Sequence, residues 1–197
     1  MTLYLPFLIL SDKPAYGKLV QHAFKNNPIV YGSAAFNPGT EYAGIIFCGG
    51  PHISPCFYGG VSVVDEHYDY ERDCIECAIY TIAKARRIPM FGICRGMQFL
   101  WAMDGGSLTD VVGHNKITHP VFTIEGQMKV YSEHRQVIMP YRRQTVFSLD
   151  AWCDGYPEAI SNELYGIYAV QWHPERMSML SGGAQYFINL LKKHADA

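Results

Sequence analysis

A cysteine between two glycines is the first candidate for chemistry in this sequence. Residues 91–98 read Phe-Gly-Ile-Cys-Arg-Gly-Met-Gln, which places Cys94 directly behind an apolar, strand-like run. Glycines at positions 92 and 96 let the chain turn sharply from strand to helix and leave the side chain at the bend exposed, as in the elbow of serine hydrolases. The helix that follows, from Gly96 to Met103, would favour a thiolate by pointing its positive end at the sulfur. The pattern predicts a nucleophile, although a lone free cysteine is more often a buried structural residue.

A histidine far downstream could complete this chemistry. Residues 169–175 read Ala-Val-Gln-Trp-His-Pro-Glu, so that a strand-like run ends just before His173. Pro174 stops strand pairing and fixes the backbone after the histidine. Glu175 is close enough in sequence to bind the imidazole and set its tautomer. Alone, such a turn is more typical of a solvated loop, but together with Cys94 it predicts a Cys94–His173–Glu175 triad.

The elements that must position these residues alternate between strands and helices. Strand-like runs end at positions 48, 93 and 171, and the carboxyl ends of parallel strands meet at one edge of a sheet. The alternation predicts a mainly parallel central sheet flanked by helices on both faces, and the hairpin-like middle predicts an antiparallel addition. The expected strands are 3–10, 29–31, 44–48, 89–93, 121–124, 127–131, 145–150 and 165–171, and the expected helices are 15–25, 69–87, 96–103 and 182–192.

The order of these motifs resembles the class I glutamine amidotransferase superfamily, and within it the γ-glutamyl hydrolase branch. The resemblance covers nearly the whole chain and implies a flavodoxin-like α/β fold. Beyond the cysteine and histidine motifs it is carried by the glycine loop 49–59, by Glu71-Arg72-Asp73 with Glu76, by Gly105-Gly106-Ser107-Leu108, by His119-Pro120-Val121, by the segment 130–136 with Ser132-Glu133-His134, and by 154–160.

The expected reaction is cysteine-dependent hydrolysis of a γ-glutamyl amide through a glutamyl thioester, with release of ammonia or an amine. The Cys94 thiolate would attack the amide carbonyl, and the backbone N–H groups of Gly50 and Arg95 would form the oxyanion hole. His173 would protonate the leaving amine and then activate water, while Glu175 holds the imidazole in its productive orientation.

The resemblance also implies which residues contact the substrate. These are Gln98 and the segment Ser132, Glu133 and His134, which would bind the α-amino and α-carboxylate ends. Each has an alternative interpretation, since Gln98 could simply line its helix and the segment could be an ordinary exposed turn.

The resemblance leaves the substrate open. An amidotransferase would pass ammonia to a synthetase or acceptor subunit, which we expect to be a separate protein, whereas a γ-glutamyl hydrolase would act on a larger γ-glutamyl amine or peptide. Arg95 and the Ser-x-His segment favour the hydrolase branch. However, His52 stands where the branch often has an acidic residue, and Tyr131 where it often has Asn. A third alternative is a catalytically idle binding subunit of a synthetase, which an intact triad disfavours.

The composition limits the class of protein. With 197 residues, 49% of them hydrophobic, the chain is expected to form a single domain, residues 1–197, with a substantial core. A net charge of −2, without a basic run beyond Arg142-Arg143, argues against nucleic acid as a ligand. The apolar run 3–10 lacks the flanks of a signal peptide, and no stretch is long enough to span a membrane. Six cysteines in a chain of this size indicate free thiols in a reducing compartment, so we expect a cytoplasmic protein.

Two sets of residues have side chains of metal-binding type, but neither predicts a site. Cys74 and Cys77 have a C-x-x-C spacing, yet no second pair follows and the segment reads as one helix. His114 and His119 fall in a polar segment without an accompanying ligand set. We therefore expect no metal and no cofactor.

Overall fold

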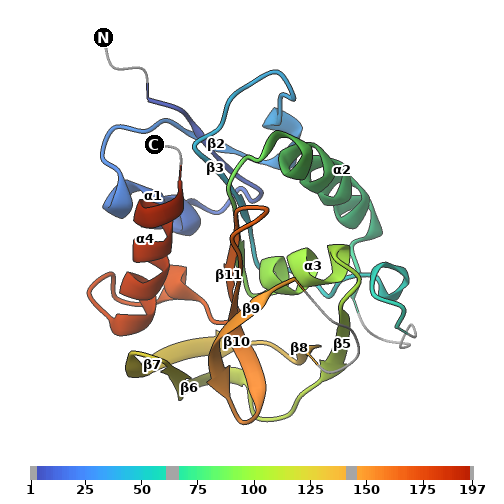
Figure 1. Ribbon diagram of the computed structural model, residues 1–197, viewed down its shortest axis with the longest axis vertical. Coiled ribbons are helices and arrows are strands. Elements are labelled where there is room, and N and C mark those ends of the chain that lie inside the picture. The colour runs from blue at the N-terminus through green and yellow to red at the C-terminus, as the bar shows by residue number, and fades with distance from the viewer. Residues whose placement is uncertain (1–3, 61–66, 141–145, 196–197) are drawn as a thin grey trace.

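The fold is built on a nine-stranded mixed sheet with a two-stranded sheet beside it (Figure 1). The computed structural model describes residues 4–60, 67–140 and 146–195. The strands are β1 (Phe7–Ile9), β2 (Ile29–Tyr31), β3 (Gly44–Phe47), β4 (Met90–Ile93), β5 (Ser107–Asp110), β6 (Asn115–Thr123), β7 (Gly126–Glu133), β8 (Gln136–Met139), β9 (Ser148–Cys153), β10 (Tyr156–Asn162) and β11 (Ile167–Val170). The helices are α1 (Pro14–Ala23), α2 (Tyr70–Arg86), α3 (Arg95–Met103) and α4 (Gly182–His194), with short 3₁₀ turns η1 (Ser33–Ala35), η2 (Pro55–Phe57) and η3 (Pro174–Arg176).

The large sheet has a parallel half and an antiparallel half. Its strand order is β2-β1-β3-β4-β11-β10-β9-β6-β7. The first five strands in this order run parallel, and the last four continue the sheet in antiparallel fashion. The predicted parallel sheet with an antiparallel addition is confirmed, and the addition comprises four strands rather than one hairpin. Central strands are buried on both faces, which is why β3 and β11 read as unbroken apolar runs.

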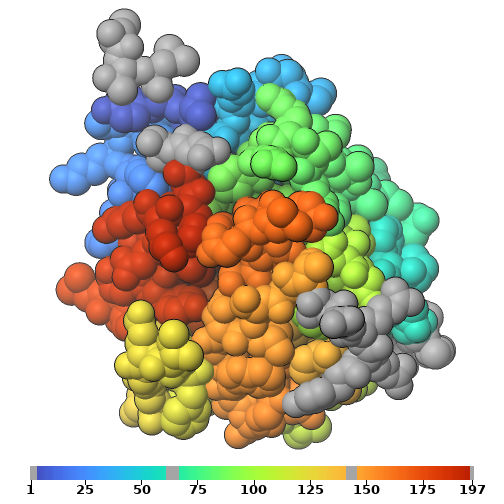
Figure 2. Space-filling model, in the orientation of Figure 1, coloured from blue at the N-terminus to red at the C-terminus, as the bar shows by residue number. Residues whose placement is uncertain are grey.

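Helices cover both faces of the parallel half, as predicted (Figure 1). The pair α1 and α4 packs on one face, while α3 packs on β3, β4 and β11 from the other, alongside α2. Side chains alternate along each strand, so Phe7 and Ile9 join the core with Phe187 of α4, whereas Leu8 joins the opposite core. The helix α4 also contacts β7, and Figure 2 shows these two segments side by side in red and yellow. Among the described residues, no helix has both the length and the apolar character needed to cross a membrane.

The long helix α2 begins and ends at capping residues. The Asp69 carboxylate accepts a hydrogen bond from the Arg72 N–H at 3.1 Å, which satisfies one of the free amides of the first turn. At the other end Arg87 has a left-handed backbone with a φ of 56°, and its N–H donates to the carbonyls of Ala83 and Lys84. The predicted helix 69–87 is therefore α2 together with its two caps.

The strands β5, β8 and β10 were not predicted. The strand β10 follows β9 across a two-residue turn of Asp154 and Gly155, whose φ values are 50° and 82°. An Asp-Gly pair is a strong signal for such a turn, whereas a proline such as Pro157 is uncommon inside a strand. Ile124, predicted as a strand end, is instead fully exposed in the turn between β6 and β7. The predicted strand starts at residues 3 and 145 lie outside the described residues.

The first turn of α3 approaches β3 more closely than any side chain would allow. A Cβ at Gly96 would lie 1.9 Å from the carbonyl oxygen of Phe47 and 2.5 Å from its carbonyl carbon. Both atoms belong to the backbone of a buried strand, so they cannot move aside without shifting the sheet. Gly96 thus sets how closely α3 packs on β3, and with it the position of the residue just before the helix.

We expect Gly96→Ala to lower the free energy of unfolding by about 2–3 kcal/mol, because the added methyl group forces α3 away from β3. Urea denaturation measures the change. The matched control is Gly39→Ala, where the nearest atom is the exposed side-chain oxygen of Asn37 at 3.3 Å. Gly39→Ala should lower the free energy of unfolding by less than about 0.5 kcal/mol. Equal losses in both variants would contradict the close-packing account.

Candidate active site

Cys94 occupies a strained bend between β4 and α3. Its φ of 52° and ψ of −108° are rare for a residue with a side chain, and such a conformation costs on the order of 1–3 kcal/mol. The bend is held between Ile93, the last residue of β4, and Arg95, the first of α3. In addition the Cys94 N–H donates to the Val170 carbonyl at 2.8 Å. The sulfur therefore lies at the carboxyl edge of the parallel strands, where binding sites of open α/β sheets gather.

His173 reaches this edge because its strand is the neighbour of β4. The strands β4 and β11 pair in parallel with Ile93 opposite Val170, so the segments that follow both strands leave the sheet together. The His173 N–H donates to the Tyr131 carbonyl at 2.9 Å, which fixes the turn after β11 against β7.

The His173 imidazole has a carboxylate on one side and the Cys94 sulfur on the other. Its Nδ1 lies 2.7 Å from Glu175 Oε1, and the two side chains are 5% and 3% exposed. Burial alone lowers the pKa of His173. The charge of Cys94 and its hydrogen bond, followed by those of Glu175, outweigh burial and raise the pKa to about 10. At neutral pH the arrangement favours an imidazolium beside the cysteine.

The glycine loop after β3 is held from two sides. Arg72 of α2 donates to the carbonyls of Cys48 and Gly49 at 3.1 and 3.2 Å. A Cβ at Gly50 would lie 2.2 Å from Arg72 Nη1, so the guanidinium can lie over this position only because it is glycine. From the other side, the Tyr16 hydroxyl is hydrogen-bonded to the Gly49 backbone. Burial, followed by the negative charge of Glu175, raises the pKa of Tyr16, so this hydroxyl stays protonated.

A buried ion network joins α3 to the same loop. The Arg95 guanidinium is 1% exposed, pairs with Asp73, and lies 2.5 Å from Glu76 Oε2 through Nη1. The other oxygen of Glu76 accepts from Arg72 Nε at 2.7 Å. The other oxygen of Asp73 accepts the Ser54 N–H at 2.8 Å. The network fixes the start of α3 relative to the glycine loop, and sequence analysis, which placed Arg72, Asp73 and Glu76 only on a helix, did not predict it.

A cavity of about 270 Å³ lies over the sulfur. Cys94, Gly50 and Arg95 line it together, so the structure brings the predicted nucleophile and both predicted oxyanion-hole residues to one space. The Arg95 N–H is the first amide of α3, and the first amides of a helix lack an acceptor within the helix. The polar and charged side chains in the lining are those of His52, Gln98, Asn115, Lys116, Glu133, His134 and Arg135.

Three of the four predicted substrate residues line this cavity, and the fourth does not. The Cys94 thiol lies 3.9 Å from the carbonyl oxygen of Glu133. Gln98 and His134 also line the cavity, although the Gln98 amide already donates to a backbone carbonyl at 2.7 Å. Ser132 is fully buried, and its hydroxyl lies 2.8 Å from a histidine ring in the antiparallel half.

Sequence analysis gave no site role to four polar residues of the lining, which are His52, Asn115, Lys116 and Arg135. His52 lies 2.8 Å from the Gln136 side chain through Nδ1, and Lys116 and Arg135 bring positive charge to the cavity. The last two flank the β6–β7 hairpin at its open end, so only the pairing of these strands brings them together. The predicted hairpin, with strands 121–124 and 127–131, was too short to include this end.

Comparison with known proteins identifies the family of this chain. The model of the peptidase C26 family matches residues 40–121. The Schizosaccharomyces pombe protein named "Putative glutamine amidotransferase PB2B2.05" is 31% identical over 182 residues, which cover 77% of this chain and 70% of that protein. The chain belongs to the class I glutamine amidotransferase family. This family, with peptidase C26, consists of cysteine-dependent hydrolases, which is the class predicted from the sequence.

Two further proteins are similar to this chain, one in sequence and one in fold. The glutamine-hydrolysing GMP synthase of Bacillus cereus is 31% identical over 150 residues, which cover 72% of this chain but 25% of the synthase. The chain therefore spans about a quarter of that enzyme's length. A solved glutamine amidotransferase from Thermotoga maritima superposes with a TM-score of 0.68 over 88% of this chain and 77% of the other, at 15% identity. At this identity the likeness shows the fold alone.

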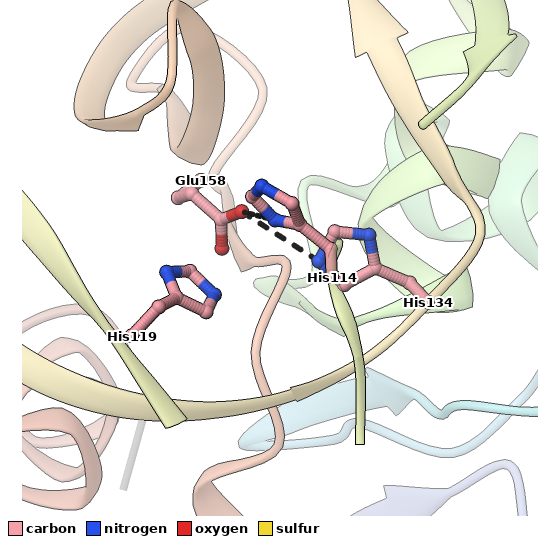
Figure 3. Close-up of side chains that lie close together, drawn as sticks. All are labelled: His114, His119, His134 and Glu158. Carbon is pink, nitrogen blue, oxygen red and sulfur yellow. Dashed lines mark ion pairs between the residues drawn. The ribbon is translucent and has the colours of Figure 1, made fainter. Parts of the chain in front are cut away.

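A second group of side chains gathers in the antiparallel half of the amidotransferase fold. His114 and His119 were expected to lack an accompanying ligand set, but the structure brings them together with His134 and Glu158 (Figure 3). Cys74 lies exposed on α2 and joins no such group in the part of the chain that the structure describes.

We expect Arg95→Met to lower the free energy of unfolding by about 3–5 kcal/mol, because it leaves Asp73 and Glu76 as buried carboxylates without a countercharge. Urea denaturation of both proteins at neutral pH gives the difference. The control is Arg86→Met, an exposed arginine on α2, which should change stability by less than about 1 kcal/mol. A small loss for Arg95→Met would show that the network does not hold the fold.

Proposed function

We propose that this chain hydrolyses a γ-glutamyl amide, with glutamine as the first candidate, through a thioester on Cys94. The observation that carries the proposal is the strained Cys94 bend facing a His173 whose pKa is raised to about 10 by the sulfur and by Glu175. A thiolate and an imidazolium side by side are the two groups that acyl transfer from an amide requires.

The first step forms the tetrahedral intermediate. The Cys94 thiolate attacks the side-chain carbonyl of the γ-glutamyl group, a C–S bond forms, and the carbonyl electrons move to oxygen. The backbone N–H groups of Gly50 and Arg95, which border the same cavity, are proposed to hold this oxyanion. One such donor contributes about 3 kcal/mol to transition-state stabilisation in comparable sites.

The later steps alternate the proton on His173. The intermediate collapses, the C–N bond breaks, and the imidazolium protonates the departing ammonia or amine. The neutral imidazole then takes a proton from water, which attacks the thioester carbonyl and releases glutamate and the Cys94 thiolate. Glu175, 2.7 Å from Nδ1, keeps the other ring nitrogen directed at the reaction and stabilises the positive charge.

The cavity supports a small substrate. Its volume of about 270 Å³ lies just below the range of about 300–1,000 Å³ typical of sites for drug-sized ligands. The lining includes Glu133, whose carboxylate also pairs with Arg176, together with the positively charged Lys116 and Arg135. Charges of both signs suit an amino-acid zwitterion. Gln98 adds a polar side chain to the same lining. These features favour glutamine or a short γ-glutamyl amine over a γ-glutamyl peptide.

We also propose that the ammonia is used by a separate synthetase or acceptor protein. The support is that the chain matches a quarter of the length of a protein named as a glutamine-hydrolysing GMP synthase. All six cysteines are free thiols, which supports a reducing, cytoplasmic setting.

We expect Cys94→Ala to lower the rate of γ-glutamyl hydrolysis by about 10⁴-fold or more, because no other group can form the thioester. The assay compares ammonia release from glutamine with amine release from γ-glutamyl amines. Cys56→Ala, which changes an exposed cysteine, should retain full activity. Full turnover by Cys94→Ala would refute the mechanism, and a wild-type protein that neither turns over these substrates nor shows fast alkylation of Cys94 would be an idle binding subunit.

We expect kcat/KM to fall as the pH rises through about 10, the raised pKa of His173. Below this pKa the imidazolium can protonate the leaving amine, and above it that proton is lost. Glu175→Gln removes one of the charges that raise the pKa, so the alkaline fall should move to lower pH. Glu125→Gln, an exposed carboxylate in the β6–β7 turn, is the control and should leave the profile unchanged. Circular dichroism over the same pH range separates titration from unfolding, and identical profiles for all three proteins would contradict the assignment.

A further inference from the structure

Four buried side chains converge in the antiparallel half, and one of them, His134, also borders the cavity over the proposed nucleophile (Figure 3). They are His114, just before β6; His119, in β6; His134, just after β7; and Glu158, in β10. One ligand atom from each lies within 4.8 Å of all the others, and no member is more than 8% exposed. We propose that these residues, the three-histidine site, bind one zinc ion.

The first argument is that the facing atoms have no hydrogen-bond partner. Within the described chain this holds for His114 Nδ1, His134 Nε2 and both carboxylate oxygens of Glu158. The two nitrogens lie 3.3 and 3.6 Å from Glu158 Oε1. These distances exceed a normal N–H···O hydrogen bond of about 2.7–3.2 Å. They approach the roughly 3.3 Å that separates two ligands bound at about 2.0–2.1 Å in a zinc tetrahedron.

The second argument is the orientation of the imidazole rings. The outer Nε2 of His114 lies 3.4 Å from an Asp154 carboxylate oxygen, and the outer Nδ1 of His134 lies 3.1 Å from the Gln136 carbonyl. The Gln136 carbonyl can only accept, so Nδ1 of His134 carries the proton and a neutral ring has its lone pair on Nε2, toward Glu158. The contact of His114 with Asp154 is longer than a normal hydrogen bond, but the charge of this carboxylate favours the same arrangement. Metal-binding histidines have this arrangement, with the second nitrogen donating to a carboxylate or carbonyl.

His119 follows the same pattern with one difference. Its Nδ1 lies 3.1 Å from the Pro120 carbonyl, which leaves Nε2 as the acceptor, and Nε2 lies 2.8 Å from the Ser132 hydroxyl. An entering cation would take the Nε2 lone pair in exchange for this neutral hydroxyl. A fully buried carboxylate facing two unpartnered imidazole nitrogens is stabilised by a positive charge between them, which a divalent ion would supply.

The ligand set indicates a structural zinc site. Three imidazoles and a carboxylate give four protein ligands and leave no open position, whereas catalytic zinc sites keep one for water or substrate. A smaller group of His114, Cys153 and Asp154 shares one member, but its carboxylate is 78% exposed. A zinc ion bound by the four buried ligands would join the β6–β7 hairpin to β10. It would thereby hold Glu133, the neighbour of His134, in the wall of the cavity over the nucleophile.

The test is metal content and metal-dependent stability of the full chain, free of any purification tag. Elemental analysis should find about one zinc per chain, lost on treatment with a strong chelator. Zinc added at about 100 times its Kd should then raise the Tm by roughly 5–10 °C. Cobalt added to the metal-free protein should give the visible bands of a tetrahedral ion without a thiolate charge-transfer band. Absence of zinc uptake, of the Tm rise and of the cobalt bands would overturn the proposal and leave protons as the positive charge.

Variants identify the ligands. Glu158→Gln and His114→Ala should each lose zinc binding, while His22→Ala, an exposed histidine on α1, should keep it. If a ligand variant does not fold, the wild-type zinc and cobalt titrations decide alone. Cys94→Ala should retain one zinc per chain, so failure of the proposed hydrolysis and failure of the zinc site give separate results. Equal zinc binding by the wild type and both ligand variants would overturn the assignment.

Discussion

Parallel pairing between β4 and β11 is the constraint on which the candidate active site depends. The two strands come from distant parts of the sequence, and their pairing places Ile93 opposite Val170. Both segments then leave the sheet at one edge, the first through the bend at Cys94 and the second through the turn at His173. A slip of one residue would turn the side chains of β11 to the opposite face and displace the imidazole. The register of two buried strands, rather than the loops, therefore sets the relation of sulfur to imidazole.

Buried ion pairs position the parts of the candidate active site that the sheet does not. The pairing of β4 and β11 does not position the glycine loop after β3, which is held instead by Arg72 and by the contacts of Asp73 and Glu76 with Arg95. Buried ion pairs contribute little net stability compared with apolar packing, but removing one partner is costly. Their effect here is geometric, since they restrict where α2, α3 and the loop can lie relative to one another. They therefore also restrict the shape of the cavity that the loop and α3 line.

Local patterns predicted the features that local geometry decides. The bend at Cys94, the turn at His173 and the central strands each depend on a few neighbouring residues, and the structure places all of them as expected at one sheet edge. The partners of the Arg95 side chain come from α2, and no spacing rule connects them. The three-histidine site forms only when the sheet brings the β6–β7 hairpin close to β10, with β9 between them, so the spacing of ligands along the sequence does not reveal it. The strand β10 could have been predicted from the sequence, because the Asp154-Gly155 turn comes directly before it.

The backbone and the side chain of Arg95 lie in different surroundings. Its backbone amide begins α3 at the cavity, while its guanidinium lies among the carboxylates of α2. Every residue except proline would supply the same backbone amide, so a requirement for the amide alone would not determine which side chain stands at position 95. The ion pairs with Asp73 and Glu76 are what require an arginine there. Among relatives, positions 73, 76 and 95 should accordingly change as a set, and a relative that has lost the arginine should also have lost its acidic partners.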